Sequence, residues 1–273
     1  MAVSHDGFGS QLKEWRQRRR MSQLDLALEA DVSPRHLSFV ETGRSRPSRD
    51  MVIRLSERLQ IPLRNRNSLL MAAGFAPSYS NRSLDHPDLN QARSAIQRIL
   101  DGHLPYPAFA IDRYWNMVAC NSVIPLLMAG ASPALLEPPL NVLRLSLHPD
   151  GLANSIANLG EWKGHVLERL KGQIAASGDP DLEELYNELR AYPAPASRTP
   201  PDPAAGIAVP LILDTQFGRL SFFGTVTVFG TPFEVTLSEI AIESLFPGDE
   251  ETGEHLRRIA SASTTGTGQP GTM

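Results

Sequence analysis

The stretch MSQLDLALEADVSPRHLSFVETGRSRPS, residues 21–48, decides the fold of the first part of the chain. It holds two short helical patterns divided by an Ala-Asp-Val corner at residues 30–32. Ser22 is placed to cap the first helix, and Ser33, followed by proline at the first helical position, is placed to cap the second. Asp31 stands where such a corner usually has glycine, and aspartate tolerates the left-handed backbone conformation better than most residues do. The stretch therefore predicts two short helices joined by a tight turn.

Apolar residues at helical spacing extend this pattern to five short helices over residues 7–74. In the second helix we expect Leu24, Ala27 and Leu28 to point inward, and Ala27 is small enough for helices to approach closely. The five helices then share one small core. The second and third form a helix-turn-helix unit, whose second helix enters the major groove of DNA while the first crosses the backbone.

Charge divides the chain unevenly. Residues 1–80 hold 13 Lys and Arg against 8 Asp and Glu, whereas residues 81–273 hold 13 against 22. A basic front part joined to an acidic body indicates a polyanion partner for the first and a different task for the second. The alternative is surface charge without a partner. Combined with the helical pattern, the charge favours double-stranded DNA.

The composition excludes several classes of protein. The single cysteine, Cys120, rules out an intramolecular disulfide framework and a cysteine-rich zinc site, and we expect no metal. No run of 18 or more apolar residues occurs, and the first ten residues lack the charged and apolar regions of a signal peptide. The sequence thus predicts a cytoplasmic protein that does not contact a membrane.

The character of the sequence changes after the first 76 residues. Residues 77–90 are typical of a linker, and a helix is expected from about residue 87 to residue 100. The stretch AFAIDRYWNMVACNSVIPLLM, residues 108–128, predicts a two-stranded hairpin that leads into a helix. Further helices are expected over residues 152–177 and 180–191, before a proline-rich connector at 192–206.

Three late segments, VPLILDT, GRLSFFGTVTVFG and PFEVTLSEIAIESLF, are rich in β-branched and aromatic residues and are typical of antiparallel strands. After residue 250 the chain is mostly polar and predicts disorder. The sequence therefore predicts a multi-domain protein with an all-α five-helix helix-turn-helix domain at 1–76, a linker at 77–90, an α+β domain with an antiparallel sheet at 91–250, and a disordered tail at 251–273.

The first part resembles the Xre (Cro/C1-type) helix-turn-helix family. SQLDLALEADVSPRHLSFVETGRSRPS has that family's Ser-Gln, Leu-Ala, Val-Ser and Glu-x-Gly pairs, followed by basic residues and Pro-Ser, at matching spacings. The resemblance covers about residues 8–74. It implies that DNA phosphates are held by Gln23 and Ser33, and that the segment after the recognition helix approaches the backbone through Arg44, Ser45 and Arg46.

The same resemblance puts Pro34, Arg35 and Phe39 at base-facing positions. Pro34 and Phe39 cannot make the hydrogen bonds of a polar residue, so direct reading is expected from Arg35, helped by His36 or Ser38. Arginine can donate two hydrogen bonds to guanine O6 and N7, and phenylalanine can pack on a thymine methyl. The alternative for Arg35 is a solvated helix surface.

The acidic body contains no set of residues with catalytic spacing. It has no Gly-x-Ser-x-Gly, phosphate-loop or dinucleotide fingerprint, and its histidines are scattered. We therefore expect no enzyme activity and no cofactor. Cys120 is expected on a buried strand as a packing residue.

The order of elements in the body, a hairpin, then helices, then strands, is similar to the PAS-like fold. With HLPYPAFAIDRYWNMVACN, NVLRLSLHPDGL, ELRAYPAP and LSFFGTVTVFGTPFEVTLSEIAIESLFPGDE, nearly all of residues 8–251 resemble the MmyB-like transcription regulators. The resemblance implies an Xre-type DNA-binding domain followed by a PAS-like ligand-binding domain, with a long-chain fatty acid as the type of effector.

Candidate ligand contacts fall in two sets. The apolar set would alternate along the strands of the body, and core packing is the alternative for each member: Phe109, Ile111, Trp115, Met117, Leu220, Phe222 and Phe229. The polar set could anchor a charged head group, since a buried carboxylate is costly unless it is paired; it consists of Arg113, Asn116, Asn121, Arg144 and His148. Turn or helix caps are the alternative for the two asparagines, and an internal ion pair or hydrogen bond for Arg144 and His148.

The sequence thus predicts a DNA-binding regulator that senses an apolar effector, binds DNA as a homodimer and catalyses no reaction. Two other readings of the body stay open. It could be a dimerisation module without a ligand, which would have a core filled by side chains. It could also be a degenerate enzyme domain, for which the sequence offers no set of residues with catalytic spacing.

Overall fold

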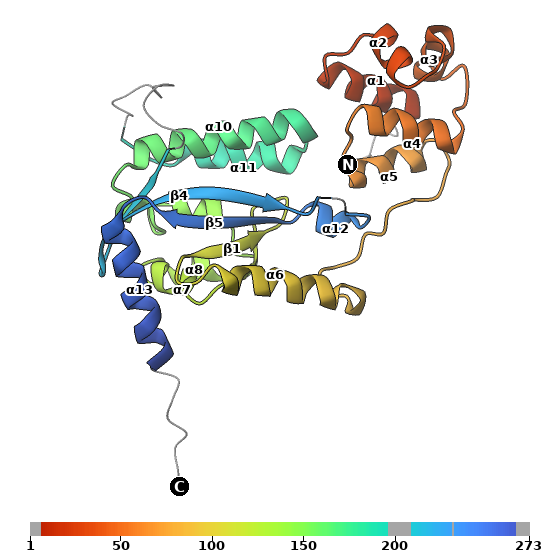
Figure 1. Cartoon of the computed structure of the whole chain (residues 1–273). Coiled ribbons are helices and arrows are strands. Elements are labelled where there is room, and N and C mark those ends of the chain that lie inside the picture. Colours follow the sequence, from red (N-terminus) through yellow and green to blue (C-terminus); the bar gives the residue numbers. More distant parts are fainter. Residues whose placement is uncertain (1–6, 196–208, 231, 266–273) are drawn as a thin grey trace. The chain divides into compact units, whose positions relative to one another are not determined.

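The computed structural model describes residues 7–195, 209–230 and 232–265, which divide into two compact units (Figure 1). The helical unit consists of Met1–Ser83 together with Ala175–Gly178 and Thr231–Ser238. The remaining residues make up the sheet unit. Each unit has its own buried apolar clusters, so each is described by itself.

The helical unit contains the five predicted helices: α1 Phe8–Arg18, α2 Gln23–Glu29, α3 Pro34–Glu41, α4 Arg49–Arg58 and α5 Leu63–Ala72. Serine hydroxyls cap three of them, as the oxygens of Ser22, Ser33 and Ser48 accept hydrogen bonds from backbone N–H groups in the first turns of α2, α3 and α4. At the corner between α2 and α3, Asp31 has a φ of 51°. The predicted left-handed aspartate is confirmed.

The inward face of α2 differs from the prediction. Leu26 and Ala27 are fully buried, whereas Leu24 is 55% exposed and Leu28 is 71% exposed. The prediction was right for Ala27 and wrong for Leu24 and Leu28, because the segment from Leu24 to Ala30 holds two apolar pairs at i, i+4 spacing, Leu24 with Leu28 and Leu26 with Ala30. Packing against α3 and α4, which the local sequence does not encode, selects the second pair.

The sheet unit has a five-stranded antiparallel sheet with the order β2-β1-β5-β4-β3. Its elements are η1 Pro87–Leu89, α6 Asn90–Gly102, β1 Ala108–Ile111, β2 Met117–Cys120, α7 Ile124–Leu127, α8 Pro133–Leu136, α9 Val142–Leu147, η2 Ala153–Ser155, α10 Leu159–Ser177, α11 Pro180–Ala191, β3 Leu211–Thr215, β4 Gly218–Val228, β5 Ala241–Pro247 and α13 Glu250–Thr265. This arrangement confirms the predicted α+β domain with an antiparallel sheet.

The two faces of the sheet are covered by different helices. Ala108 and Ala110 of β1 pack in a cluster with α6, whereas Ile111 packs in a cluster with α9, α10 and α11. Successive side chains of a strand point to opposite faces, which explains this alternation. Figure 1 shows α10 and α11 on one side of β4 and β5 and α6 on the other.

Two predictions about the last part of the chain were wrong. The segment predicted as a strand before β5 contains a helical turn, α12 Val235–Ser238, which clusters with the helical unit. The predicted disordered tail forms α13 up to residue 265, because Leu256 and Ile259 lie on one face of a helix and pack against the sheet. Asp249 accepts a hydrogen bond from the N–H of Thr252 at its start. Residues 266–273 and most of the proline-rich connector lie outside the described residues.

The first part of the predicted linker is fixed within the helical unit by two side chains. The Asn67 amide accepts hydrogen bonds from the N–H groups of Ser78 and Tyr79, at 3.0 and 3.1 Å, and donates to the Tyr79 carbonyl at 2.7 Å. Glu234, just before α12, accepts from the N–H groups of Arg82 and Leu237. This part of the linker is therefore an ordered strap between α5 and α12.

Candidate DNA interface and ligand cavity

The predicted base-reading residues lie on α3. Its start is fixed by the Ser33 hydroxyl, which accepts a hydrogen bond from the N–H of His36 at 3.2 Å. Pro34 and Arg35 are exposed, and the Arg35 guanidinium lies 5.4 Å from the centre of the Phe39 ring. Residues four apart lie on the same face of a helix, so Arg35 and Phe39 form one solvent-facing surface that combines a cation with an aromatic ring.

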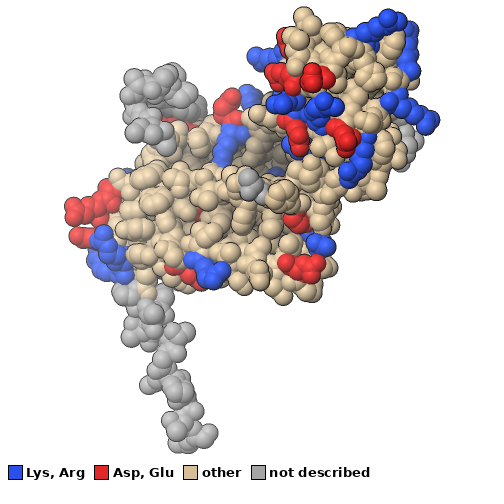
Figure 2. Space-filling model, turned by 45° about the vertical axis from the view of Figure 1, so that its right-hand side comes forward, with Lys and Arg blue, Asp and Glu red and all other residues tan. Residues whose placement is uncertain are grey.

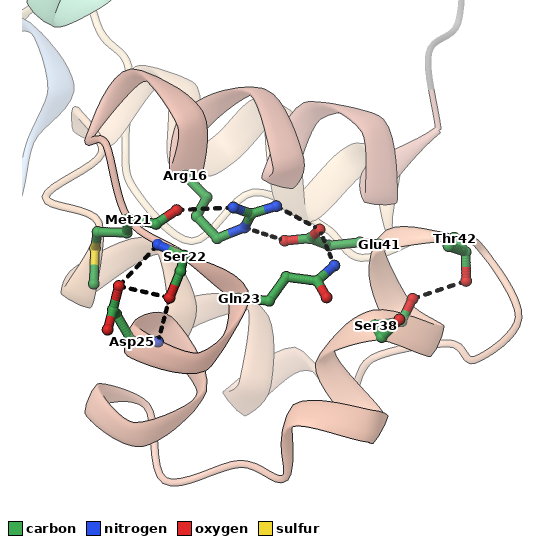
Figure 3. A network of polar contacts seen from close by, with 8 residues as sticks. All are labelled: Arg16, Met21, Ser22, Gln23, Asp25, Ser38, Glu41 and Thr42. Carbon is green, nitrogen blue, oxygen red and sulfur yellow. Dashed lines mark hydrogen bonds and ion pairs between the residues drawn. The ribbon is translucent and has the colours of Figure 1, made fainter.

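A buried polar network orients α3 relative to α1 and α2 (Figure 3). The Arg16 guanidinium donates two hydrogen bonds to the Glu41 carboxylate, at 2.7 and 2.9 Å, and a third to the Met21 carbonyl at 2.8 Å. The Gln23 amide also donates to Glu41, at 2.7 Å. The network holds the recognition helix by its last residue. It also engages the side chain of Gln23, which the sequence assigned to a phosphate.

Basic side chains follow α3. Gly43 has a φ of 71° and ends the helix, after which the N–H groups of Arg44 and Ser45 both donate to the Phe39 carbonyl. Arg44 and Arg46 are exposed. Figure 2 shows basic side chains gathered over the surface of the helical unit. A positive surface next to an exposed recognition helix is the electrostatic pattern of phosphate binding.

The sheet unit contains an apolar cavity of about 190 Å³ between the sheet and α10. Most of its lining is aliphatic or aromatic, and it comes from the strands and from α7, α9 and α10. The helix α10 contributes Trp162, His165, Val166 and Arg169, which follow the i, i+3, i+4, i+7 spacing of one helix face. Strand β5 contributes Glu243 and Leu245, and β4 contributes Gly224 and Val226.

The polar groups of the cavity are few. The Arg169 guanidinium donates to both carboxylate oxygens of Glu243, at 2.5 and 3.3 Å, and lies 4.5 Å from the centre of the Trp115 ring. His165 lies one turn before Arg169, and its pKa is lowered by burial and then by the charge of Arg169. The Trp162 indole donates to the Ser146 hydroxyl at 2.8 Å. The cavity therefore combines apolar walls with one group of polar side chains.

Three of the seven predicted apolar contacts, Phe109, Trp115 and Met117, line this cavity. The other four lie elsewhere in the sheet unit. Ile111 packs beside the cavity in the cluster with α9 and α10, Leu220 and Phe222 pack against α13, and Phe229 joins the cluster with α6.

The five predicted polar anchors do not line the cavity, and each has partners elsewhere. Their partners are as follows: Arg113 pairs with Asp179 and Glu239, Asn116 donates to Asp112, Asn121 donates to the Leu100 and Tyr106 carbonyls, Arg144 binds Glu188, and the ring nitrogen of His148 accepts from the N–H of Asp150. For the two asparagines, Arg144 and His148 these are the kinds of role that the sequence left open as alternatives, whereas the ion pairs of Arg113 were not expected.

The polar residues that do line the cavity were missed. Two signals could have found them. The segment from Trp162 to Arg169 mixes polar and aromatic residues on one helix face, where a helix that only packs would be apolar. Glu243 is the one charged residue in the strand sequence AIESLFP, on the same face as Leu245.

The described residues contain no cluster of metal-ligating side chains. None of the described helices is long and apolar enough to cross a membrane.

An exposed recognition helix on one unit and an apolar cavity in the other define a DNA-binding regulator with a ligand-binding domain. Two family models match the chain in this order. Residues 12–64 match a helix-turn-helix model, and residues 92–259 match the MmyB-like transcription regulator ligand binding domain. The chain belongs to the MmyB-like transcription regulators, as the sequence predicted, and both matched families are regulatory.

Among solved structures, the chain is similar to an RNA-binding light-oxygen-voltage receptor. The sequence identity is 13% and the TM-score is 0.24, over 92% of this chain and 63% of the receptor chain. No curated protein sequence matches the chain.

Proposed function

We propose that the sheet unit binds a long-chain fatty acid or a similar amphiphile in its cavity, and that this ligand changes the affinity of the helical unit for DNA. The observation that carries the proposal is the lining of the cavity. Small-molecule sites are concave and mostly apolar, with a few polar groups that fix orientation. Here the apolar walls suit an acyl chain, and the group of His165, Arg169 and Glu243 suits a polar head.

In this proposal the head group is bound by Arg169 and by none of the five polar residues expected from the sequence. A head group in an apolar site needs a charged or hydrogen-bonding partner, and a guanidinium supplies several donors in a fixed geometry. Trp115 lies under Arg169 and Trp162 is close to His165, so both aromatic side chains hold the polar group in place.

Extraction of the purified protein with organic solvent, followed by mass spectrometry, tests this proposal. We expect a stoichiometric amount of one acyl compound. Protein that is extracted without any amphiphile, and that later takes up none of the C12 to C18 acids in a thermal-shift assay, would support the other reading, a domain that only dimerises. A cavity of this kind is not expected in a core that only dimerises.

For the helical unit we propose that α3 enters the major groove of double-stranded DNA and that two chains bind together. A single recognition helix contacts too few base pairs to select a site in a genome, and helix-turn-helix dimers bind half-sites about 34 Å apart or a multiple of it. Sedimentation with a short operator tests this part. We expect two chains per duplex, and one chain at saturating protein would contradict it. A regulator of this kind acts where the DNA is, in the cytoplasm.

The ligand can change DNA affinity only if it binds two conformations of the protein with different affinity. Connections along the chain offer a route. Strand β5 carries Glu243 and Leu245 and begins three residues after α12, which Glu234 joins to the strap at Arg82. The strap in turn is bound by Asn67 of α5. A shift of β5 on ligand binding would therefore act on a segment that is hydrogen-bonded within the helical unit.

A further inference from the structure

The charged side chains at the polar end of the cavity have no net charge in the absence of a ligand. Among the described residues that line the cavity, Arg169 and Glu243 are the two charged side chains, and their closest atoms, Nη2 and Oε1, are 2.5 Å apart. The Glu243 side chain is 7% exposed and the Arg169 side chain is 31% exposed. The cavity thus holds one positive charge and one negative charge, and the negative charge is the more deeply buried.

Among the residues that the structure describes, the elements packed around Glu243 supply no second charged cation to the cavity lining. Its partners in the neighbouring strands are Phe109 of β1 and Val226 of β4. The helix α10 faces it with Arg169 and His165; burial and the charge of Arg169 lower the pKa of His165, against the opposing effect of Glu243, and this favours the neutral imidazole. A carboxylate head that enters this site would therefore place a second negative charge beside Glu243, opposite a single guanidinium. Two carboxylates that share one site cannot both stay ionised without a large cost.

We propose that Glu243 makes the cavity select a head group that is neutral when bound, one that accepts a hydrogen bond from Arg169 and donates one to Glu243. This inference rests on the proposed ligand-binding function. An alcohol or a primary amide meets the requirement as it is. A fatty acid meets it by taking up one proton from solvent, which then lies between its carboxyl group and the Glu243 carboxylate. The complex then contains one shared proton, one net negative charge on the carboxyl pair and the positive charge of Arg169.

The dependence of affinity on pH tests the proposal. Dodecanoic acid and dodecan-1-ol are titrated into delipidated full-length protein between pH 7 and pH 9, with tryptophan fluorescence as the signal because Trp115 and Trp162 line the cavity. If the acid takes up one proton when it binds, its affinity should fall about tenfold for each unit by which the pH rises. The affinity for the alcohol should stay unchanged. Equal affinity for the acid at pH 7 and pH 9 would overturn the proposal.

Glu243→Gln removes the negative charge and keeps the shape of the side chain. In this variant the acid should bind as the anion, with an affinity that does not change between pH 7 and pH 9 and exceeds the wild-type affinity at least tenfold at pH 9. Glu188→Gln is the matched control. Glu188 also pairs with an arginine, Arg144, but lies outside the cavity lining, so its variant should keep the wild-type pH dependence.

Calorimetry of the wild-type protein gives a reading that does not depend on the folding of any variant. The binding enthalpy of dodecanoic acid at pH 8, measured in two buffers with different ionisation enthalpies, should report one proton taken up per ligand. Binding of the acid without proton uptake would overturn this inference and leave the proposed function standing. Failure of both the acid and the alcohol to bind would contradict the proposed function itself.

Discussion

Two arginine–glutamate pairs, one in each unit, have the same chemistry and different surroundings. Arg16 and Glu41 lie in the core of the helical unit, where Gln23 and the Met21 carbonyl complete their hydrogen bonds. Arg169 and Glu243 lie at the edge of a cavity. The first pair has all its partners within the folded chain, and it fixes three helices. The second pair faces a space that a ligand can fill.

The apolar cores of the two units also differ, since one is filled by its side chains and the other surrounds a cavity. Leu12, Leu26, Leu37, Leu55 and Leu70 of the helical unit are completely buried. In the sheet unit, Leu143, Leu145, Leu213 and Leu245 are nearly as well buried and yet line a cavity of about 190 Å³. The first core supports a function that lies on its surface. The second core leaves space that its own side chains do not fill, and we propose that the ligand binds there.

Breaking the first pair should have the largest effect on stability. Glu41→Ala leaves Arg16 as an uncompensated buried charge, because the Glu41 side chain is 1% exposed and the pair is closed to solvent. We expect the helical unit to lose about 3 to 5 kcal/mol. Hydrogen exchange of peptides from α1 to α4 measures this loss within the full chain.

The matched control is Glu14→Ala in the same unit. Glu14 pairs with Arg18 on the surface of α1, and its side chain is 60% exposed. An exposed pair of this kind contributes about 0.3 to 0.5 kcal/mol. A loss of similar size in the two variants would show that the buried network does not hold the helical unit together.

Adding a large side chain sharpens the comparison of the two cores. Ala27→Leu forces extra volume into the core of the helical unit, where Ala27 is fully buried, and should cost about 1 to 3 kcal/mol. Gly224→Leu puts the same side chain into the cavity. A Cβ atom at Gly224 has ordinary contacts at 3.6 Å with Leu245 and 3.9 Å with Glu243, so the cost in stability should be below about 1 kcal/mol. Thermal unfolding compares the two variants.

Ligand uptake should respond in the opposite order. Gly224→Leu should weaken binding of dodecanoic acid at least tenfold, whereas Ala27→Leu should leave it unchanged. Thr225→Leu is the control on the same strand, since its side chain points to the other face of the sheet. If Gly224→Leu binds the acid as well as the wild type does, the cavity is not the ligand site.

Two substitutions on the surface of the helical unit separate base reading from phosphate contact. Arg35→Ala should weaken binding to a selected operator by about 1 to 3 kcal/mol and relax the preference at one base position. Arg46→Ala should weaken binding to all sequences. It should also reduce the slope of log affinity against log salt concentration by about one, since one phosphate contact is lost. Titrations of an operator and of an unrelated duplex at several salt concentrations distinguish the two. Equal operator affinity of the wild type and Arg35→Ala would remove Arg35 from the reading role.

The parts of the fold that depend on local signals were predictable from the sequence. Serine caps and the Asp31 corner mark α2 and α3, an uninterrupted apolar run marks β1, and β-branched and aromatic residues mark β4. The face of α2 that is buried was not predictable. Leu24 and Leu26 are the same type of residue, and only packing against other helices decides which of them points inward. The helix α13 was missed because Leu256 and Ile259, which pack against the sheet, are separated by polar residues in a mostly polar segment.

The sequence predicted that the sheet unit has an apolar cavity, but it predicted only some of the residues that line this cavity. The hairpin gave Phe109, Trp115 and Met117 because it is distinctive in sequence. The polar end was missed because Arg169 and Glu243 are 74 positions apart and meet only when α10 crosses the sheet. Charged residues near the distinctive motifs, such as Arg144, were instead satisfied by partners that the sequence does not reveal.

The central claim is that occupancy of the cavity controls DNA binding, and operator affinity measures it most directly. Delipidated wild-type protein is titrated with an operator selected in vitro, with and without saturating dodecanoic acid at pH 7, and Gly224→Leu is measured in parallel. Coupling between two sites is commonly about 5- to 150-fold in affinity. The account predicts a change of at least fivefold in the wild type and no change in Gly224→Leu. Equal operator affinity of the free and the ligand-saturated wild type would contradict it.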